Sequence, residues 1–170
     1  SAVNQDGKSQ GITAPNELAQ EKVLAAALKD AGTAPQDVGY IEAHGTGTSL
    51  GDPIELAALQ SVYGQQRDSA NPLIVGSIKT NIGHLEAAAG IAGLMKVVLT
   101  LQHNKIPQHL HFEEPNPYFD WSSSSITVPK HSKEWLPGDN TPDKKTGEQR
   151  ITGLSSFGFS GTNCHIIIAD

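Results

Sequence analysis

The sequence predicts an α/β fold with a mostly parallel sheet of five strands, helices on both faces and a last strand that runs antiparallel. Short apolar runs, typical of buried strands, alternate with longer runs of helical period, and this order favours right-handed crossovers between parallel strands. The last two apolar runs are joined by residues 157–162, which contain two glycines and indicate a hairpin. We expect the first parallel strand to lie just before residue 1, so that the chain is part of a larger domain.

The first helix is predicted over residues 16–32. Asn16 follows Pro15 and is a suitable N-cap, and Gly32 is a suitable stop because glycine adopts the left-handed conformation that ends many helices. The predicted buried face of this helix holds Leu24, Leu28 and Ala31. The apolar residues 38–43 then predict a short strand.

The second helix is predicted to begin at Asp52 and to end at Gly64. Asp52 would be the N-cap, Pro53 would occupy the first helical position, and Glu55 would complete a capping box with Asp52. These two carboxylates, like Glu42 at the end of a predicted strand, therefore have structural explanations that need no acid–base chemistry.

The rest of the chain predicts three strands, one helix and one long loop. Residues 73–77 form a continuous apolar run, typical of a strand buried on both faces. Residues 83–103 predict a third helix, and their many alanines and glycines favour a central, tightly packed position. Residues 104–149 hold six of the ten prolines and show no period, as functional or covering loops do. Residues 150–155 and 163–169 predict the last strands. The chain thus divides into residues 1–103, the extension 104–149 and the final part 150–170.

Composition excludes several classes of function. The net charge of −6 and the pI near 5.6 argue against nucleic-acid or anionic-membrane binding, which needs a basic surface. The longest apolar stretch, residues 87–101, contains Lys96 and is too short to span a bilayer. The single cysteine, Cys164, excludes an internal disulfide and favours a cytoplasmic location.

Chemically active residues follow three of the predicted strands. They are His44 after residues 38–43, Lys79 and His84 after residues 73–77, and Phe157 after residues 150–155. In parallel sheets, ligands bind beyond the carboxyl ends of the strands. We therefore expect a functional site at this edge of the sheet, with two histidines, one lysine and a glycine-rich turn.

His84 is predicted at the N-terminus of the third helix, where the helix dipole disfavours a charged imidazole. Lys79 would act in the same direction if it reached the same pocket. A neutral imidazole in such a place can donate a hydrogen bond to a developing oxyanion. The alternative is that His84 caps the helix or fills a gap in the packing.

The glycine-rich residues 44–52 do not match a nucleotide-binding loop. HGTGTSLGD has neither of the glycine spacings that cradle phosphates. A tight turn that lets a ligand approach the backbone is the better interpretation, with the hydroxyls of Thr46 and Thr48 available for hydrogen bonds.

A metal site and a reactive thiol are not expected. His103, His109 and His111 are loosely spaced and lack a supporting pattern of cysteines or carboxylates. Cys164 lies within the last predicted strand, where buried cysteines are usually inert.

Seven motifs, in order along nearly the whole chain, resemble the ketosynthase (β-ketoacyl synthase) domains of modular polyketide synthases. They are SAVNQDG at 1–7, TAPN at 13–16, EAHGTGT at 42–48, GDPIE at 51–55, GSIKTNIGHLEAAAG at 76–90, EPNP at 114–117 and SSFGFSGTNCH at 155–165. The resemblance implies the C-terminal half of a thiolase-like fold, in which two similar halves pack into five α/β/α/β/α layers.

The resemblance also implies a reaction, the decarboxylative Claisen condensation. An acyl chain is held on an active-site cysteine, and a malonyl-type extender is carried on the phosphopantetheine arm of an acyl carrier protein. No cofactor would be bound directly. The extender loses carbon dioxide, and the resulting enolate attacks the acyl thioester.

By the same resemblance, His44 and His84 would donate hydrogen bonds to the extender carbonyl, and Lys79 would orient His84. The Phe157 N–H would join the oxyanion hole, while its ring would gate the acyl pocket. The resemblance further assigns Thr46, Thr48 and Phe159 to substrate binding, the two threonines holding the pantetheine arm.

The motif of the nucleophilic cysteine is absent from these 170 residues. Because no acyl-enzyme forms without that thiolate, we expect the chain alone to be inactive and to need the N-terminal half of the ketosynthase as its partner. An acyl carrier protein and a second copy of the complete domain are the other partners that the resemblance implies. The alternative function is a non-elongating ketosynthase that transfers acyl chains, although such forms usually lose the first histidine, and His44 is present.

Overall fold

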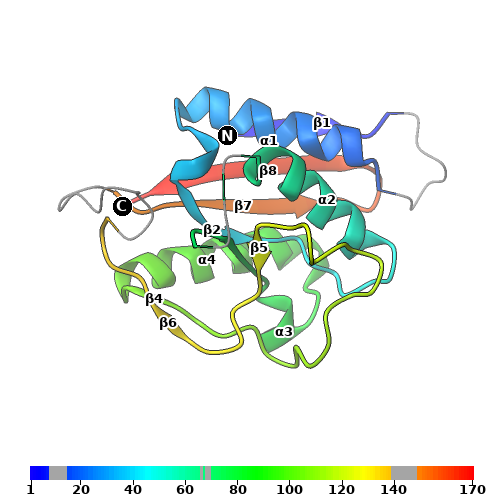
Figure 1. The fold of residues 1–170 in the computed structure, drawn as a ribbon. Helices are drawn as coiled ribbons and strands as arrows, with labels where there is room; N and C mark the ends of the chain where they lie inside the picture. The colour runs from blue at the N-terminus through cyan, green and yellow to red at the C-terminus, as the bar shows by residue number, and fades with distance from the viewer. Residues whose placement is uncertain (8–14, 66, 68–69, 139–148) are drawn as a thin grey trace.

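The computed structural model describes residues 1–7, 15–65, 67, 70–138 and 149–170. It has a six-stranded sheet with helices on both sides (Figure 1). The strands are β1 (Ala2–Gln5), β2 (Val38–Glu42), β3 (Leu73–Gly76), β5 (Ile126–Thr127), β7 (Ile151–Phe157) and β8 (Thr162–Ala169). Their order across the sheet is β1-β8-β7-β2-β3-β5.

The pairing of the strands confirms the predicted mixed topology. β2 lies parallel to both β3 and β7, and β3 lies parallel to β5. The last strand, β8, is antiparallel to β7, as predicted, and also to β1. The edge strands β1 and β5 were not predicted within the chain, because each is short and lacks a strong apolar pattern.

The first helix, α1 (Glu17–Ala31), has the predicted ends. The Asn16 side chain accepts a hydrogen bond from the Ala19 N–H at 3.2 Å, and Gly32 adopts the left-handed conformation with φ of 63°. Leu24 and Leu28 are buried as predicted, whereas Ala31 is exposed because it lies at the last position of the helix. A 3₁₀ turn, η1 (Pro35–Asp37), leads from α1 to β2.

The second helix, α2 (Gly51–Tyr63), follows Leu50 and has no side-chain cap. The predicted capping box is therefore wrong: the carboxylates of Asp52 and Glu55 bind backbone N–H groups of the glycine-rich turn instead of the helix end.

The predicted helix over 83–103 is not continuous. That range holds the 3₁₀ turn η2 (Glu86–Ala88) and α4 (Ala89–Gln102), and a separate short helix, α3 (Lys79–Ile82), precedes it. Gly83 and Glu86 both have positive φ, 74° and 48°, which a continuous helix does not allow. The long helix therefore begins six residues later than predicted, at Ala89 rather than Gly83.

The long loop contributes more structure than its sequence predicts. β5 joins the main sheet from this segment, and β4 (Lys105–Ile106) and β6 (Lys133–Glu134) form a small antiparallel pair. Trp135, 1% exposed, anchors the segment in the core. Residues 139–148 of the loop and residues 13–14 of the TAPN motif lie outside the described residues. The three-part division of the chain stays a prediction.

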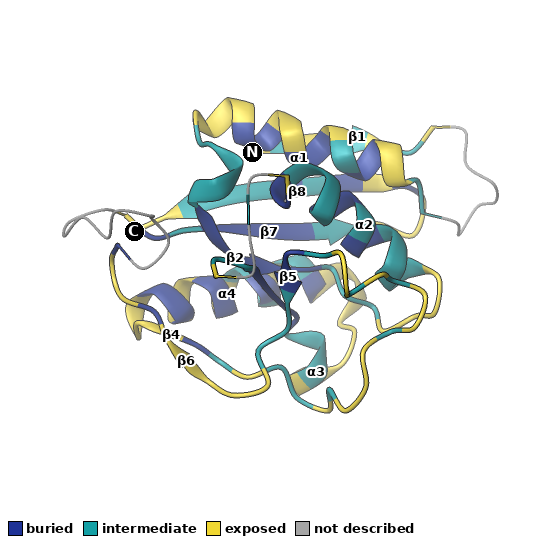
Figure 2. Ribbon diagram, viewed as in Figure 1, coloured by how far each residue is buried: buried dark blue, intermediate teal, exposed yellow. Residues whose placement is uncertain are grey.

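Buried residues form two hydrophobic clusters, one on each face of the sheet. Figure 2 colours the buried positions of the sheet and helices dark blue. On one face, α1 and α2 pack on alternate strand residues such as Ile41 and Val75. On the other, Val97 and Leu101 of α4 pack with Tyr40. This chain therefore has three layers, with the sheet in the middle.

The α4 helix is packed on one face and exposed on the other. Ile91, Met95, Val98 and Leu99 are 54%, 63%, 39% and 51% exposed, and their spacing places them on one stripe of the helix. We call these four residues the apolar stripe of α4. The helix is thus tightly packed on one side only within the described chain.

The cap of α1 can be tested by substitution. Asn16→Ala removes the acceptor for the Ala19 N–H and should lower the free energy of unfolding by about 1 kcal/mol. Asn16→Asp retains the acceptor and adds a charge that suits a helix N-terminus, but it loses the bond from Asn16 Nδ2 to the Asp6 carbonyl oxygen, so it should recover only part of that stability. Urea unfolding of the protein measures both, and equal losses in the two variants would contradict the role of the cap.

Candidate active site

The carboxyl ends of β2, β3 and β7 bring the predicted site residues together. His44 follows β2, and its ring centre lies 5.5 Å from that of His84 with the rings at 84°. The ring centre of Phe157, the last residue of β7, lies 5.6 Å from that of His44. The edge of the sheet predicted from the sequence is therefore where these side chains meet.

Six of the seven predicted site residues line one groove: His44, Thr46, Thr48, His84, Phe157 and Phe159. His44 is half-buried, His84 is exposed, and Phe159 is 79% exposed. The seventh residue, Lys79, lies behind His44. The groove thus has an aromatic wall from β7 and a hydroxyl-bearing wall from the glycine-rich turn.

The backbone of the turn is held by the buried carboxylate of Glu55, which is 5% exposed. The His44 N–H donates to Glu55 Oε1 at 2.7 Å, and the Gly45 N–H donates to Oε2 at 2.8 Å. Asp52 holds the next part of the turn, since its Oδ1 accepts from the Gly47 N–H at 3.0 Å. This role is hidden in the sequence because a D-x-x-E pattern at a helix start also matches a capping box.

Gly45 is required by the geometry of the turn. It has a φ of 48°, and a Cβ at this position would lie 2.8 Å from the Cβ of Ser77. The absence of a side chain therefore lets the end of β2 lie directly against the end of β3.

Burial changes the ionisation of the groups around the turn. Burial raises the pKa of Glu55 to about 7, although its bonds to the Gly45 and His44 amides act in the opposite direction. Burial also raises the pKa of Asp52 and lowers the pKa of Lys79. The two carboxylates and the ammonium group therefore share one poorly hydrated region next to His44.

Lys79 contacts the first histidine rather than the second. Its Nζ donates to the His44 carbonyl oxygen and lies 3.5 Å from His44 Nδ1. The expectation that Lys79 orients His84 is therefore not met in this structure. The short helix α3 directs the lysine toward β2, whereas His84 lies beyond Gly83 in the following loop.

Both imidazoles are arranged to donate from Nε2. Burial, with smaller effects from Lys79 and His84, lowers the pKa of His44 to about 3, so this ring is neutral at physiological pH. An ammonium group can only donate, and its position near Nδ1 places the ring proton of His44 on Nε2. His84 Nδ1 accepts from the Glu86 N–H at 2.9 Å, which likewise leaves Nε2 as the donor when the ring is neutral.

The dipole of the third helix was predicted to act on His84, but the structure shows a contact with the Glu86 N–H instead. Because α4 begins at Ala89, His84 is not at the N-terminus of that helix. The ring instead accepts a hydrogen bond from the N–H of Glu86, the first residue of the turn η2, and caps neither this turn nor α4.

The three loop histidines do not come together as a metal site. Among the described residues, no group of three or more histidine, cysteine, aspartate or glutamate side chains could hold a metal ion. His109 instead accepts a hydrogen bond at Nδ1 from the Ser77 N–H, at 3.2 Å. In the same described part of the chain, no helix has the length and apolarity needed to cross a membrane.

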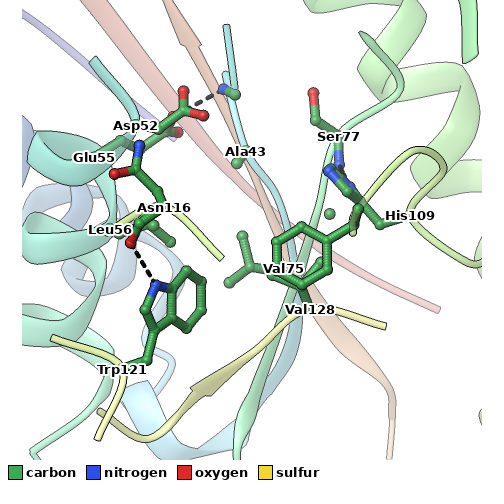
Figure 3. A pocket seen from close by; sticks show the side chains of 13 residues that line it. Ala43, Asp52, Glu55, Leu56, Val75, Ser77, His109, Asn116, Trp121 and Val128 are labelled. Atoms are coloured by element: carbon green, nitrogen blue, oxygen red, sulfur yellow. Dashed lines mark hydrogen bonds between the residues drawn. The ribbon is translucent and has the colours of Figure 1, made fainter. Parts of the chain in front are cut away.

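A cavity of about 100 Å³ is lined by residues of the turn, such as Ala43 and Gly45, together with residues of α2, β3 and the long loop (Figure 3). Asp52, Glu55 and Leu56 of α2 lie on one side of it, and Ser77 and His109 lie on the other. Glu55 lines both the cavity and the groove.

The family model of the β-ketoacyl synthase C-terminal domain matches residues 1–113. Since the match covers more than half of the chain, the chain belongs to the β-ketoacyl synthase family and forms its C-terminal domain. More particularly, it is the C-terminal half of a ketosynthase domain of the modular polyketide-synthase kind, with the thiolase-like fold that the sequence indicates.

Two curated relatives are multidomain synthases. Erythronolide synthase EryA3 of Saccharopolyspora erythraea is 51% identical over 170 residues, which are 100% of this chain and 5% of the relative. The phenolphthiocerol synthesis polyketide synthase type I Pks15/1 of Mycobacterium bovis is 51% identical over the same length, 8% of that protein. The chain thus spans less than a tenth of these relatives.

Two solved structures are ketosynthase domains. The ketosynthase from module 6 of the bacillaene synthase of Bacillus subtilis 168 is 41% identical, with a TM-score of 0.89. The oxazolomycin ketosynthase domain OzmH KS7 of Streptomyces albus JA3453 is 39% identical, with a TM-score of 0.90. In each case the similarity covers 99% of this chain and 29% of the other.

Glu55→Gln tests how the turn is held. The amide would place an NH₂ group against a backbone N–H, leaving buried donors without an acceptor, and should lower the free energy of unfolding at pH 5 by about 1–3 kcal/mol. Glu113→Gln, at an exposed position, is the control and should have no measurable effect. Chemical denaturation of the ketosynthase domain that contains this chain measures both variants.

The difference in stability between the wild type and Glu55→Gln should depend on pH. The folded-state pKa of Glu55, about 7, lies above its ordinary value of 4.5, so the unfolded chain binds fewer protons between these limits. The advantage of the wild type over Glu55→Gln should therefore be full below pH 4.5 and shrink as pH rises to 7. An advantage that grows over this range would contradict the raised pKa.

Proposed function

We propose that this chain, joined to the N-terminal half of its ketosynthase, catalyses the decarboxylative condensation of an acyl thioester with a malonyl-type extender on an acyl carrier protein. The observation that carries the proposal is the pair of imidazoles, His44 and His84, 5.5 Å apart at the edge of one groove. Both rings have Nδ1 engaged, so both offer an Nε2–H to the same region. The C-terminal half would be inactive alone because it supplies no nucleophilic cysteine.

The two histidines would stabilise the charge that develops as the extender loses carbon dioxide. The bond between the α-carbon and the carboxylate breaks, and its electron pair passes into the thioester as an enolate whose oxygen accepts both Nε2–H bonds. The enolate carbon then forms a bond to the acyl carbonyl carbon. The resulting tetrahedral oxyanion collapses, the carbon–sulfur bond breaks, and the cysteine thiolate is restored.

Phe157 would contribute to the second half of this reaction. Its place at the end of β7, beside His44, supports a role for its backbone N–H in the oxyanion hole, together with the N–H of the missing cysteine. Its ring is half-buried in the groove wall, which supports a gate on the acyl pocket.

Lys79 would act through His44. A positive charge close to Nδ1 opposes protonation of the ring and directs its proton to Nε2. The lysine would thereby keep His44 a neutral donor during the cycle, which makes it a positioning residue rather than a group that touches the substrate.

The walls of the groove fit the substrate arm. Thr46 and Thr48 lie with their hydroxyl oxygens 3.1 Å apart at the mouth of the groove, where they can bond to the amides of phosphopantetheine. Phe159 is exposed in the same groove and would cover an apolar part of the substrate.

The apolar stripe of α4 supports the N-terminal half as partner. Four large apolar side chains on one helix face are costly to leave in water, and this helix follows the His84 loop directly. We propose that the partner half covers this stripe, that the complete domain forms a homodimer, and that it works in the cytoplasm with its acyl carrier protein.

His84→Ala in the complete domain tests the proposed reaction. Loss of one donor to the enolate should reduce condensation about 10²–10³-fold, while loading of the acyl chain on the cysteine continues. His103→Ala, which changes an exposed histidine outside the groove, should retain full activity. Carbon dioxide release and product formation from acyl and malonyl carrier proteins are the measurements. Undiminished condensation would refute the proposal, and transfer of acyl groups by the wild type without carbon dioxide release would favour a non-elongating ketosynthase.

The state of His44 can be measured by a histidine NMR titration of the complete domain. Because its pKa is lowered to about 3, the His44 ring should stay neutral from pH 8 down to pH 5. The unfolded ring takes up its proton near pH 6.5, so this group should raise stability as pH increases from about 3 to 6.5. Lys79→Met removes a repelling charge and should raise the pKa of His44. A wild-type midpoint near 6.5 would contradict the burial of this ring.

A further inference from the structure

The carboxylate of Glu42, the last residue of β2, connects three elements behind the site. Its Oε1 accepts a hydrogen bond from the backbone N–H of Ile78, between β3 and α3. Its Oε2 accepts from the Tyr40 hydroxyl at 2.6 Å and lies 2.7 Å from Lys96 Nζ of α4. Glu42 is 1% exposed and Lys96 is 8% exposed, so this is a buried ion pair.

Two glycines make room for this pair. A Cβ at Gly76 would lie 2.8 Å from the Tyr40 hydroxyl and 3.5 Å from Lys96 Nζ. A Cβ at Gly93 would lie 3.3 Å from Glu42 Cγ. The sheet and α4 therefore approach closely around a charged group where an apolar contact would be the ordinary solution.

The hydrogen bond to Ile78 bears on the site because the next residue is Lys79. α3 has only four residues and no side-chain cap, so its own bonds fix its position weakly. Its entry is held from outside: the Ser77 N–H donates to His109, and the Ile78 N–H donates to Glu42. Lys79, the first residue of α3, then reaches the His44 carbonyl.

We propose that Glu42, with Lys96 as its counter-ion, is a positioning residue that holds the Ile78 amide and thereby keeps Lys79 on His44. Neither residue touches the groove, so the pair acts through the backbone. This role deepens the proposed function, and the measurement of kcat that tests it depends on that function.

The test must separate the hydrogen bond from the buried charge. Removing one partner of a buried ion pair leaves an uncompensated charge, whereas replacing both is often tolerated. Glu42→Gln/Lys96→Met removes both charges and leaves an amide oxygen for the Ile78 N–H. Glu42→Leu/Lys96→Met removes both charges and the acceptor. The two variants therefore differ in two hydrogen bonds, from the Ile78 N–H and from the Tyr40 hydroxyl, and Tyr40→Phe alone is the control for the second.

Both double variants are made in the complete ketosynthase domain and compared with the wild type. We expect Glu42→Gln/Lys96→Met to keep kcat within about threefold, and Glu42→Leu/Lys96→Met to lose about ten- to a hundredfold in kcat with KM for the extender unchanged. Thermal unfolding monitors the fold in each. Equal kcat values in the two folded variants would overturn the proposal. If the leucine variant does not fold, Glu42→Met/Lys96→Met, with an unbranched side chain, takes its place.

A second readout is independent of the reaction. Crystal structures of the two variants should show Lys79 Nζ on the His44 carbonyl in the glutamine variant and displaced from it in the leucine variant. The same lysine position in both would overturn the inference. If the wild type performs no condensation, the proposed function fails, and this geometric comparison still decides the role of Glu42.

Discussion

The bidentate contact between the Glu55 carboxylate and the amides of His44 and Gly45 is the constraint on which the site depends. It converts a glycine-rich turn, which has many accessible conformations, into one fixed shape at the end of β2. Burial disfavours the charged form of Glu55 and raises its pKa. The backbone N–H groups and Lys79 favour the charged form and offset part of this effect. Buried carboxylates that bind the main chain thus hold the edge of the sheet at which His44 and His84 lie.

Much of the fold follows from local patterns in the sequence. The ends of α1 were predictable because Asn16 and Gly32 carry the chemistry of caps, and the three central strands because their apolar runs are bounded by turns. The start of α4 was not, because Gly83 and Glu86 break the helix through positive φ values that residue type alone does not reveal. The edge strand β5 depends on pairing with β3, a contact distant in the sequence.

The candidate site, like the fold, was predictable from the sequence only in part. The positions of His44, His84 and Phe157 at one sheet edge follow from topology, and the structure brings their rings together. The partner of Lys79 could not be predicted, because it depends on where a four-residue helix points. The roles of Glu42 and Glu55 were hidden because burial of a carboxylate against backbone amides leaves no pattern distinct from strand ends and caps. The chemical roles assigned to the site residues remain proposals.

The apolar stripe of α4 has a consequence for how such a protein matures. The helix that bears it begins five residues after His84 and packs its other face on the sheet that carries His44. If the partner half covers the stripe, hydrophobic assembly and completion of the groove become a single event. A newly synthesised synthase would then complete its active site in the same step that buries the apolar stripe. An incompletely assembled domain would therefore not bind an acyl chain.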